Sequence, residues 1–293
     1  MTTSNVAAFA LLFVFLVPAA PARAEYKPPR LPDNEHFTID PVVDGLLIVG
    51  GGTFDALLGE IVQTGELKPT LPSADAVNHL LAIDKGAVTQ TPDPHAGTYS
   101  NVALYAAFAY ALLDPVMSGL RDGRRAMLVD AVLYAESIAL TGAFTQATKL
   151  GVRRPRPIDY AACSGMDMVG SQCNNTDLQL SFFSGHASAT ATISATATYL
   201  AFARSGWRRP RPWITLGVGV ALTSFVSYWR VRSGAHFPTD VIMGSMAGGG
   251  IGVLVPHFHR LPHYHQEELE APPVIIGYAP APGGGTMTAE WRF

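Results

Sequence analysis

Six long apolar segments dominate the sequence and limit the folds that it can adopt. They run roughly over residues 41–62, 98–118, 125–149, 184–204, 212–229 and 238–256, with short polar connections between them. At about 1.5 Å per residue, each can cross or nearly cross a hydrocarbon layer about 30 Å thick. Small residues are frequent within them and let helices pack closely in lipid. The pattern predicts an all-α fold, a bundle of five to six mostly membrane-spanning helices.

The composition favours a membrane protein over a soluble one. Charged residues are only 15% of the chain, against about 25% in typical soluble domains. A soluble bundle stays the alternative, because Asp55, Asp130 and Glu136 lie inside segments where a carboxylate in lipid is costly. We interpret Asp130 and Glu136 as hydrogen-bonding groups of the bundle. The net charge of −3 argues against a nucleic-acid partner.

The two ends of the chain differ from its middle. Residues 1–24 resemble a signal peptide, with a small-x-small cleavage site at Ala22 to Ala24, or alternatively an uncleaved anchor. Residues 25–40 form a polar, Pro-rich arm, and residues 259–293 form a polar tail with a β-hairpin pattern at 274–278 and 286–293. The tail region also holds a group of histidines: His257, His259, His263 and His265. Their spacing beside prolines commits them to no ligand geometry, so we predict no metal site.

Charge placement predicts the orientation in the membrane. The basic connections 121–125 and 204–211 indicate the cytoplasmic side of a multi-pass inner-membrane protein. The opposite ends of the helices would then face the periplasm or exterior. An exported N-terminus would require that 41–62 does not span, as a peripheral or re-entrant helix. The alternative is that the first segment stays cytoplasmic and 41–62 spans, and both alternatives remain open.

Three short patterns, far apart in the chain, gather groups that suit phosphate chemistry. They are Lys149-x6-Arg156-Pro157, Ser184-Gly185-His186 and Arg230-x5-His236-x3-Asp240. Each pattern lies where an apolar segment ends or begins, so an antiparallel bundle would bring all three to one face. A polar set of this kind is costly near an apolar core unless it has a function.

The cationic members of these patterns suit binding of a phosphate group. Arg156 and Arg230 can each grip phosphate oxygens with a fork of donors, and Lys149 adds a point charge. Ser184 is a good helix N-cap, and Gly185 lets the backbone N–H groups approach an anion closely. Because these cations can take the place of a metal ion, we predict no cofactor and no metal.

The two histidines suit attack on phosphorus and proton transfer. Asp240 can orient the imidazole of His236 and fix its tautomer, which favours His236 as the nucleophile. His186 is then the general acid, and later the base that activates water.

These spacings resemble the type 2 phosphatidic acid phosphatase (PAP2) superfamily, membrane lipid phosphatase branch, with its patterns K-x6-R-P, P-S-G-H and S-R-x5-H-x3-D. The resemblance covers about residues 98–256 and makes 41–258 the expected phosphatase domain. It implies metal-independent phosphoester hydrolysis through a phosphohistidine. By position, His236 with Asp240 matches the nucleophile pair and His186 the acid/base. The phosphate binders match Lys149, Arg156, Ser184, Gly185 and Arg230.

The sequence departs from the family pattern at two positions. Phe183 stands where the family usually has Pro, and Trp229 where it usually has Ser. Neither replaces a reacting group, and both could line an apolar substrate mouth. Cys163 and Cys173 lie between the first two patterns, where a disulfide is expected in an exported protein, with two free thiols as the alternative.

The sequence thus predicts hydrolysis of a lipid phosphate or a polyprenyl pyrophosphate at a membrane. Three alternatives remain: a soluble periplasmic acid phosphatase of the same superfamily, a vanadium-dependent haloperoxidase, and a non-catalytic lipid-binding protein that keeps the fold.

Overall fold

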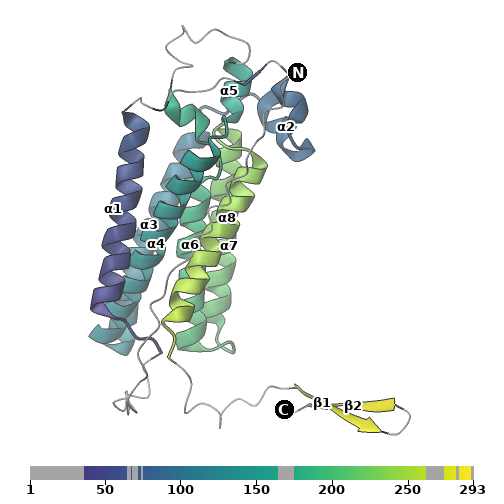
Figure 1. Cartoon of the computed structure of the whole chain (residues 1–293). Coiled ribbons are helices and arrows are strands. Elements are labelled where there is room, and N and C mark those ends of the chain that lie inside the picture. Colours follow the sequence, from purple (N-terminus) through teal and green to yellow (C-terminus); the bar gives the residue numbers. More distant parts are fainter. Residues whose placement is uncertain are drawn as a thin grey trace, which may run out of the picture. The chain divides into compact units, whose positions relative to one another are not determined.

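The computed structural model of the chain describes residues 36–64, 67, 72–73, 75–163, 175–261, 274–281 and 284–291. These residues form α-helices, two short 3₁₀ helices and one hairpin (Figure 1). The helices are α1 (Pro41–Gln63), α2 (Ala82–Thr89), α3 (Ala96–Asp122), α4 (Arg124–Val152), α5 (Pro157–Ala162), α6 (Gly185–Ser205), α7 (Pro210–Arg232) and α8 (Pro238–Phe258), with η1 (Ala76–His79) and η2 (Thr176–Gln179). Strands β1 (Val274–Ala281) and β2 (Gly284–Trp291) pair antiparallel, as the tail pattern suggested.

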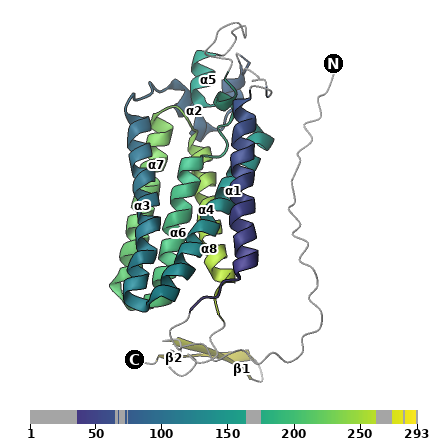
Figure 2. The same cartoon turned by 90° about the vertical axis from the view of Figure 1, so that its left-hand side faces the viewer.

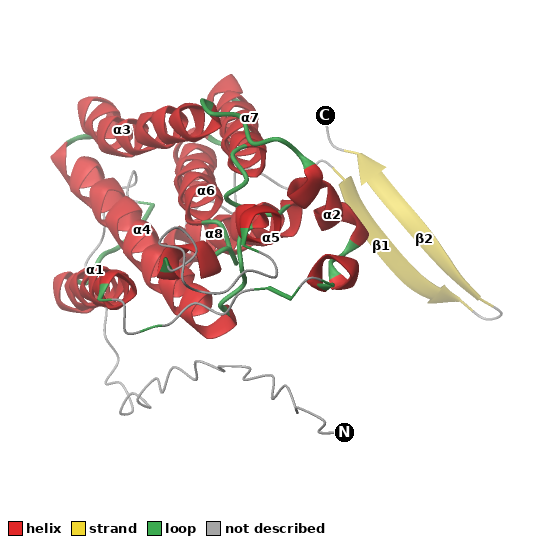
Figure 3. Ribbon diagram, turned by 90° about the horizontal axis from the view of Figure 1, so that it is seen from above, coloured by secondary structure: helices red, strands yellow, loops and turns green. Residues whose placement is uncertain are grey.

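Helix α6 lies at the centre of the bundle, with α3, α4, α7 and α8 around it (Figure 3). Glycines of α8 allow the closest approach in the bundle, because a Cβ on Gly248 or Gly252 would collide with carbonyl oxygens of α6. Thr192 and Thr196 of α6 donate hydrogen bonds to the carbonyls of these two glycines, over 2.9 and 3.1 Å. Small residues and buried hydroxyls therefore hold α6 and α8 together.

The outward faces of the long helices are apolar. Leu112 and Leu120 of α3 are 75% and 78% exposed, and similar side chains cover α1, α7 and α8. Among the described residues, five helices are long and apolar enough to cross a membrane: α1, α3, the stretch Arg124–Tyr160 that contains α4, α7 and α8. This is a membrane protein. The expected segment that is missing from this set is α6, whose hydroxyl groups are buried inside the bundle rather than turned to lipid.

Helix α1 runs without interruption along the edge of the bundle and packs chiefly against α4 (Figures 1 and 2). Gly51 makes this packing close, since a Cβ there would lie 3.2 Å from the carbonyl oxygen of Ala139. Segment 41–62 therefore forms one continuous helix that is long and apolar enough to span, and whether it spans or lies at the periphery stays a prediction.

Two buried ion pairs fix the end of the bundle that carries the basic connections. Arg204 binds Asp130, with Nη2 and Oδ1 2.5 Å apart, and Arg211 binds Asp114 over 3.2 Å. Both carboxylates are at most 5% exposed. Asp130 is thus a structural group of the bundle, as its position in the sequence suggested.

Candidate active site

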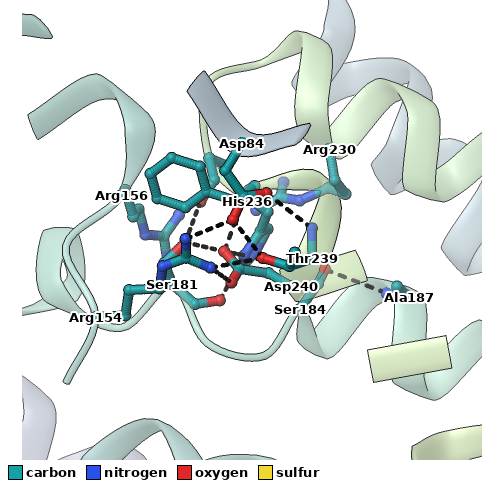
Figure 4. A network of polar contacts seen from close by, with 12 residues as sticks. Asp84, Arg154, Arg156, Ser181, Ser184, Ala187, Arg230, His236, Thr239 and Asp240 are labelled. Atoms are coloured by element: carbon teal, nitrogen blue, oxygen red, sulfur yellow. Dashed lines mark hydrogen bonds and ion pairs between the residues drawn. The ribbon is translucent and has the colours of Figure 1, made fainter. Parts of the chain in front are cut away.

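The three sequence patterns meet at the end of the bundle that also carries α2 and α5. Lys149 lies in the last turn of α4, and Arg230 lies in the last turn of α7. Ser184 caps α6 and accepts a hydrogen bond from the N–H of Ala187, while its own N–H donates to the carbonyl of Asp240. This backbone contact joins the start of α6 to the start of α8 (Figure 4).

His236 is buried in the turn between α7 and α8, with 1% of its surface exposed. Its Nδ1 lies 2.8 Å from the carbonyl oxygen of Ser181, and 3.9 Å from Oδ2 of Asp240. The carbonyl accepts only from a protonated nitrogen, so the proton sits on Nδ1 and Nε2 keeps its lone pair. The tautomer is therefore set by the backbone of Ser181, not directly by Asp240 as the sequence suggested.

Asp240 acts on His236 through Ser181. Its Oδ2 accepts from the Ser181 hydroxyl over 2.5 Å and from the Phe237 N–H over 2.9 Å. The same serine offers its carbonyl to the imidazole. Asp240 is fully buried and also accepts from Nη1 of Arg154 over 2.6 Å. It therefore fixes the residue that holds the histidine.

Arg154 and Asp84 complete this frame, and sequence reasoning missed both. Nη2 of Arg154 lies 2.7 Å from Oδ2 of the fully buried Asp84, and its guanidinium stacks 3.9 Å from the ring centroid of Phe237. Asp84 also accepts from the hydroxyl and the N–H of Thr239, the residue before Asp240. The adjacent Arg153-Arg154-Pro155 run was the signal for Arg154, whereas Asp84 stands in a short helix with no signal of its own.

The remaining cations are arranged to receive an anion. Nε of Arg230 is buried and, in the described part of the chain, has no hydrogen-bond partner. A Cβ on Gly185 would lie 3.8 Å from Nζ of Lys149, so the ammonium stands beside the first turn of α6. The charges of Arg230, Lys149 and Arg156 all act on both His186 and His236. A buried donor without a partner is costly, and an anion between these groups would remove that cost.

Arg156 reaches the site from the start of α5, but it is held by an acidic residue. Its Nη2 lies 2.8 Å from Oδ1 of Asp177, and its Nε donates to the Asp177 carbonyl over 2.9 Å. The side chain of Arg156 is 12% exposed, whereas that of Asp177 is 53% exposed. A phosphate that bound Arg156 would compete with this carboxylate.

His186 is half-buried in the first turn of α6 and contacts α3, which the sequence patterns did not include. Its Nε2 lies 2.7 Å from the amide oxygen of Asn101. The oxygen accepts, so it holds a proton on Nε2 of His186. Asn101 is a single polar residue in an apolar segment, and that isolation was its one signal.

Burial is the main cause that holds the pKa of His236 well below its ordinary value, followed by the charges of Arg156, Arg230 and Lys149. The hydrogen bond to the Ser181 carbonyl opposes this shift. The imidazole is therefore neutral at physiological pH, which a nucleophile requires.

Phe183 and Trp229, the two departures from the family pattern, differ in their burial. Phe183 is 3% exposed and packs against Phe144, so it does not line an open substrate mouth. Trp229 is half-buried and packs edge-on against Tyr99 of α3, with ring centroids 4.7 Å apart.

Among the described residues no cysteine is free. Cys173 lies outside those residues, so its bridge to Cys163 stays a prediction.

Comparison with known proteins agrees with this geometry. The sequence profile of the PAP2 superfamily matches residues 130–263, which include all three patterns. The stretch that carries the three patterns thus has the sequence of a PAP2-type phosphatase domain.

Two further comparisons add less. No curated protein matches the chain at a significant level. The crystal structure of a transmembrane PAP2 type phosphatidylglycerolphosphate phosphatase from Bacillus subtilis aligns with a TM-score of 0.43 at 19% identity. The alignment covers 78% of this chain and 97% of that chain.

Proposed function

We propose that this protein hydrolyses a phosphomonoester or pyrophosphate on a lipid, through a phosphohistidine formed at Nε2 of His236. The observation that carries the proposal is the buried Nε of Arg230, which has no hydrogen-bond partner among the residues that the structure describes and whose charge acts on His186 and His236 together with that of Lys149. This group calls for an anion, and Nε2 of His236 offers a lone pair next to it.

The reaction would proceed in two displacements. Nε2 of His236 attacks phosphorus, the bond from phosphorus to the leaving oxygen breaks, and His186 in its doubly protonated form donates a proton to that oxygen. Burial and the charges of Arg230, Lys149 and Arg156 lower the pKa of His186 to about 3 in the free site, and the negative charge of a bound phosphate would raise it again. Water then attacks the phosphohistidine, His186 takes a proton from it, and inorganic phosphate leaves. Arg230, Lys149 and Arg156 stabilise the charge on the phosphoryl oxygens in both steps. No step requires a metal ion.

A groove on the flank of the bundle supports a lipid as the substrate. It lies over α6 between α7 and α8, has a volume of 1320 Å³, and is lined largely by small and apolar side chains. At one end it includes Val241, the neighbour of Asp240, and at the other end it includes Trp207 and Arg260. We propose that an acyl or isoprenoid tail lies in this groove, with its phosphate toward the Val241 end.

The proposed orientation places the site on the periplasmic or exterior side of an inner membrane. The connection from α3 to α4 and the connection from α6 to α7 carry the basic residues, and both lie at the other end of the bundle from the site. The start of α1 pairs with the end of α8, through the N–H of Thr38 and the carbonyl of His259. Under this orientation Thr38 is cytoplasmic, which favours a cytoplasmic N-terminus over a cleaved signal peptide.

The test is phosphate release by the detergent-purified protein in EDTA. The substrates are phosphatidic acid, phosphatidylglycerol phosphate, undecaprenyl pyrophosphate and p-nitrophenyl phosphate. We expect release from at least one lipid, a loss of 10³-fold or more in His236→Ala, and normal activity in His79→Ala, whose side chain is 80% exposed. An acid-labile ³²P label on the wild type, absent from His236→Ala, would identify the intermediate.

Other outcomes would contradict the proposal. Release confined to p-nitrophenyl phosphate would favour a general acid phosphatase over a lipid phosphatase. Bromide oxidation that depends on vanadate and peroxide, without phosphate release, would favour a haloperoxidase. A folded protein that binds lipid but releases no phosphate would have a binding role.

A further inference from the structure

A second buried polar cluster lies at the end of the bundle away from the active site. Asp44 of α1, Glu136 of α4 and His259, which follows α8, each bring one ligand atom to within 4.8 Å of the others. Both carboxylates are 3% exposed. At a rise of 1.5 Å per residue, α8 separates Asp240 from His259 by roughly 28 Å. The cluster is therefore independent of the phosphate site.

One imidazole and two carboxylates face one another in this cluster. Nδ1 of His259 lies 2.8 Å from the carbonyl oxygen of Val255, so Nδ1 carries a proton. Nε2 lies 3.2 Å from Oδ1 of Asp44 and 3.4 Å from Oε2 of Glu136, and without a metal ion it donates a proton to the Asp44 carboxylate. A divalent cation can take the place of that proton, because a metal-bound histidine nitrogen is deprotonated and presents its lone pair to the ion together with the two carboxylates.

Glu136 is the member that most needs a ligand. Its Oε2 is buried and has no hydrogen-bond partner among the described residues, although it is aimed at Nε2 of His259. Asp44 differs, because its Oδ2 already accepts from the Asp40 N–H over 2.8 Å, which leaves Oδ1 for the cluster. An imidazole that donates its other N–H to a backbone carbonyl is the usual arrangement of a metal-bound histidine.

We propose that Asp44, Glu136 and His259 bind a divalent metal ion with the preferences of Zn²⁺. One imidazole nitrogen and two carboxylate oxygens are common zinc ligands, and water can complete a tetrahedral set. The ion would stabilise the fold rather than take part in phosphate hydrolysis. It would join α1, which otherwise packs chiefly against α4, to the end of α8. Two backbone hydrogen bonds connect the same regions, from Thr38 to His259 and from Leu261 to His36.

The test uses the full chain without a polyhistidine tag, stripped with EDTA in detergent. Zinc is added and removed by gel filtration, bound metal is measured by mass spectrometry, and the thermal midpoint is followed with and without zinc. We expect about one zinc per wild-type chain, and a midpoint raised by roughly 5–10 °C at a hundredfold excess over Kd. Glu136→Gln keeps the shape of the side chain but should lose both the zinc and the shift.

Two controls separate this site from the other histidines. His257→Ala removes an exposed neighbour that contacts Tyr199, and a His263→Ala/His265→Ala double variant removes the histidines of the tail. Both should bind zinc as the wild type does. Zinc lost in the tail variant but kept in Glu136→Gln would overturn the proposal, and so would a wild type that binds none. If Glu136→Gln does not fold, Asp44→Asn and the wild-type titration still decide.

The result does not depend on the proposed phosphatase reaction. Phosphate release is measured on the same samples below the lower thermal midpoint, and it should be equal with and without zinc. Failure to bind zinc would leave the reaction untouched, and failure to release phosphate would leave the zinc site untouched.

Discussion

The two ends of the bundle carry buried polar clusters that differ in which of their atoms is left without a hydrogen-bond partner among the described residues. At the active-site end, Lys149, Arg154, Arg156 and Arg230 stand among the carboxylates of Asp55, Asp84, Asp159, Asp177 and Asp240. At the other end, Asp44 and Glu136 face a single histidine. Within the part of the chain that the structure describes, one buried atom in each cluster lacks a hydrogen-bond partner: Nε of Arg230 in the first and Oε2 of Glu136 in the second. The unpartnered atom indicates the sign of the ligand, an anion at one end and a cation at the other.

The active-site cluster also consists of two groups of residues with different roles. Arg154, Asp84, Ser181 and Asp240 satisfy one another and form a rigid frame around His236. The ligand-facing cations are Lys149, Arg156 and Arg230. They lie outside this network of hydrogen bonds, and Arg156 is held by the half-exposed Asp177. Substitutions in the frame should therefore change stability, whereas substitutions among the ligand-facing cations should change activity.

The largest expected effect is on stability, in Arg154→Leu. It leaves Asp84 and Asp240 buried without their cation, and losing one partner of a buried ion pair costs about 3–5 kcal/mol. We expect that decrease in the free energy of unfolding, measured with denaturant in detergent. Arg209→Leu, at an exposed arginine, should change it by less than about 0.5 kcal/mol. Equal losses in the two variants would show that the frame does not hold the site.

Arg230→Met should give a large loss of activity, second to that of His236→Ala, without loss of stability. It removes the guanidinium, whose N–H donors face the phosphoryl oxygens in the proposed complex. Loss of one donor group that stabilises a transition state lowers kcat by about 10²–10³-fold. Arg230→Lys keeps the charge but not the planar fork, so its activity should lie between the two. Steady-state kinetics and a thermal scan on the same samples separate the effects. A methionine variant within threefold of wild type would contradict the assignment of Arg230.

The contrast between frame and ligand-facing groups also explains what the sequence could predict. Lys149, Arg230 and His236 lie at the ends of apolar segments, where local spacing alone places them at one face of an antiparallel bundle. Arg154, Asp84 and Asn101 act through partners 70 to 86 positions away in the chain. Pairing between residues so far apart in the sequence depends on how α2 and α3 pack against the bundle, and no local sequence pattern predicts that packing. The choice of the Ser181 carbonyl over Asp240 is likewise a matter of about 1 Å.

Asn101→Ala tests the contact between α3 and His186. Asn101 is a positioning residue, because it holds the ring without a proposed contact to the phosphate. We expect kcat to fall about tenfold with KM unchanged, because a tenfold change corresponds to the free energy that one hydrogen bond typically contributes. The basic limb of the pH profile of kcat should move as well, which a purely structural residue would not cause. Asn78→Ala, at an exposed asparagine, is the control, and a fall confined to KM would contradict this role.

The pH dependence should reflect the lowered pKa of His236. Burial and the neighbouring cations keep the imidazole neutral below its ordinary pKa of 6.5, so the acidic limb of kcat/KM should lie below that value. The stability of the fold should change with pH in the same direction as the activity. Below about pH 6.5 the unfolded chain binds a proton that the folded chain does not, so the free energy of unfolding decreases. Profiles for two substrates with different phosphate pKa values provide the check, and a limb at 6.5 for both would contradict the shift.

The smallest effect should come from Asp177→Asn, which loosens a ligand-facing cation instead of removing one. Asp177 holds Arg156 but is itself half exposed, and exposed ion pairs contribute less than about 1 kcal/mol. Removing its charge should make Arg156 more available to the phosphate and lower KM by about two- to fivefold, with kcat unchanged. Asp75→Asn, at another exposed aspartate, should leave KM as it is. A raised KM would mean that Asp177 orients Arg156 toward the substrate, and that this cation belongs to the frame.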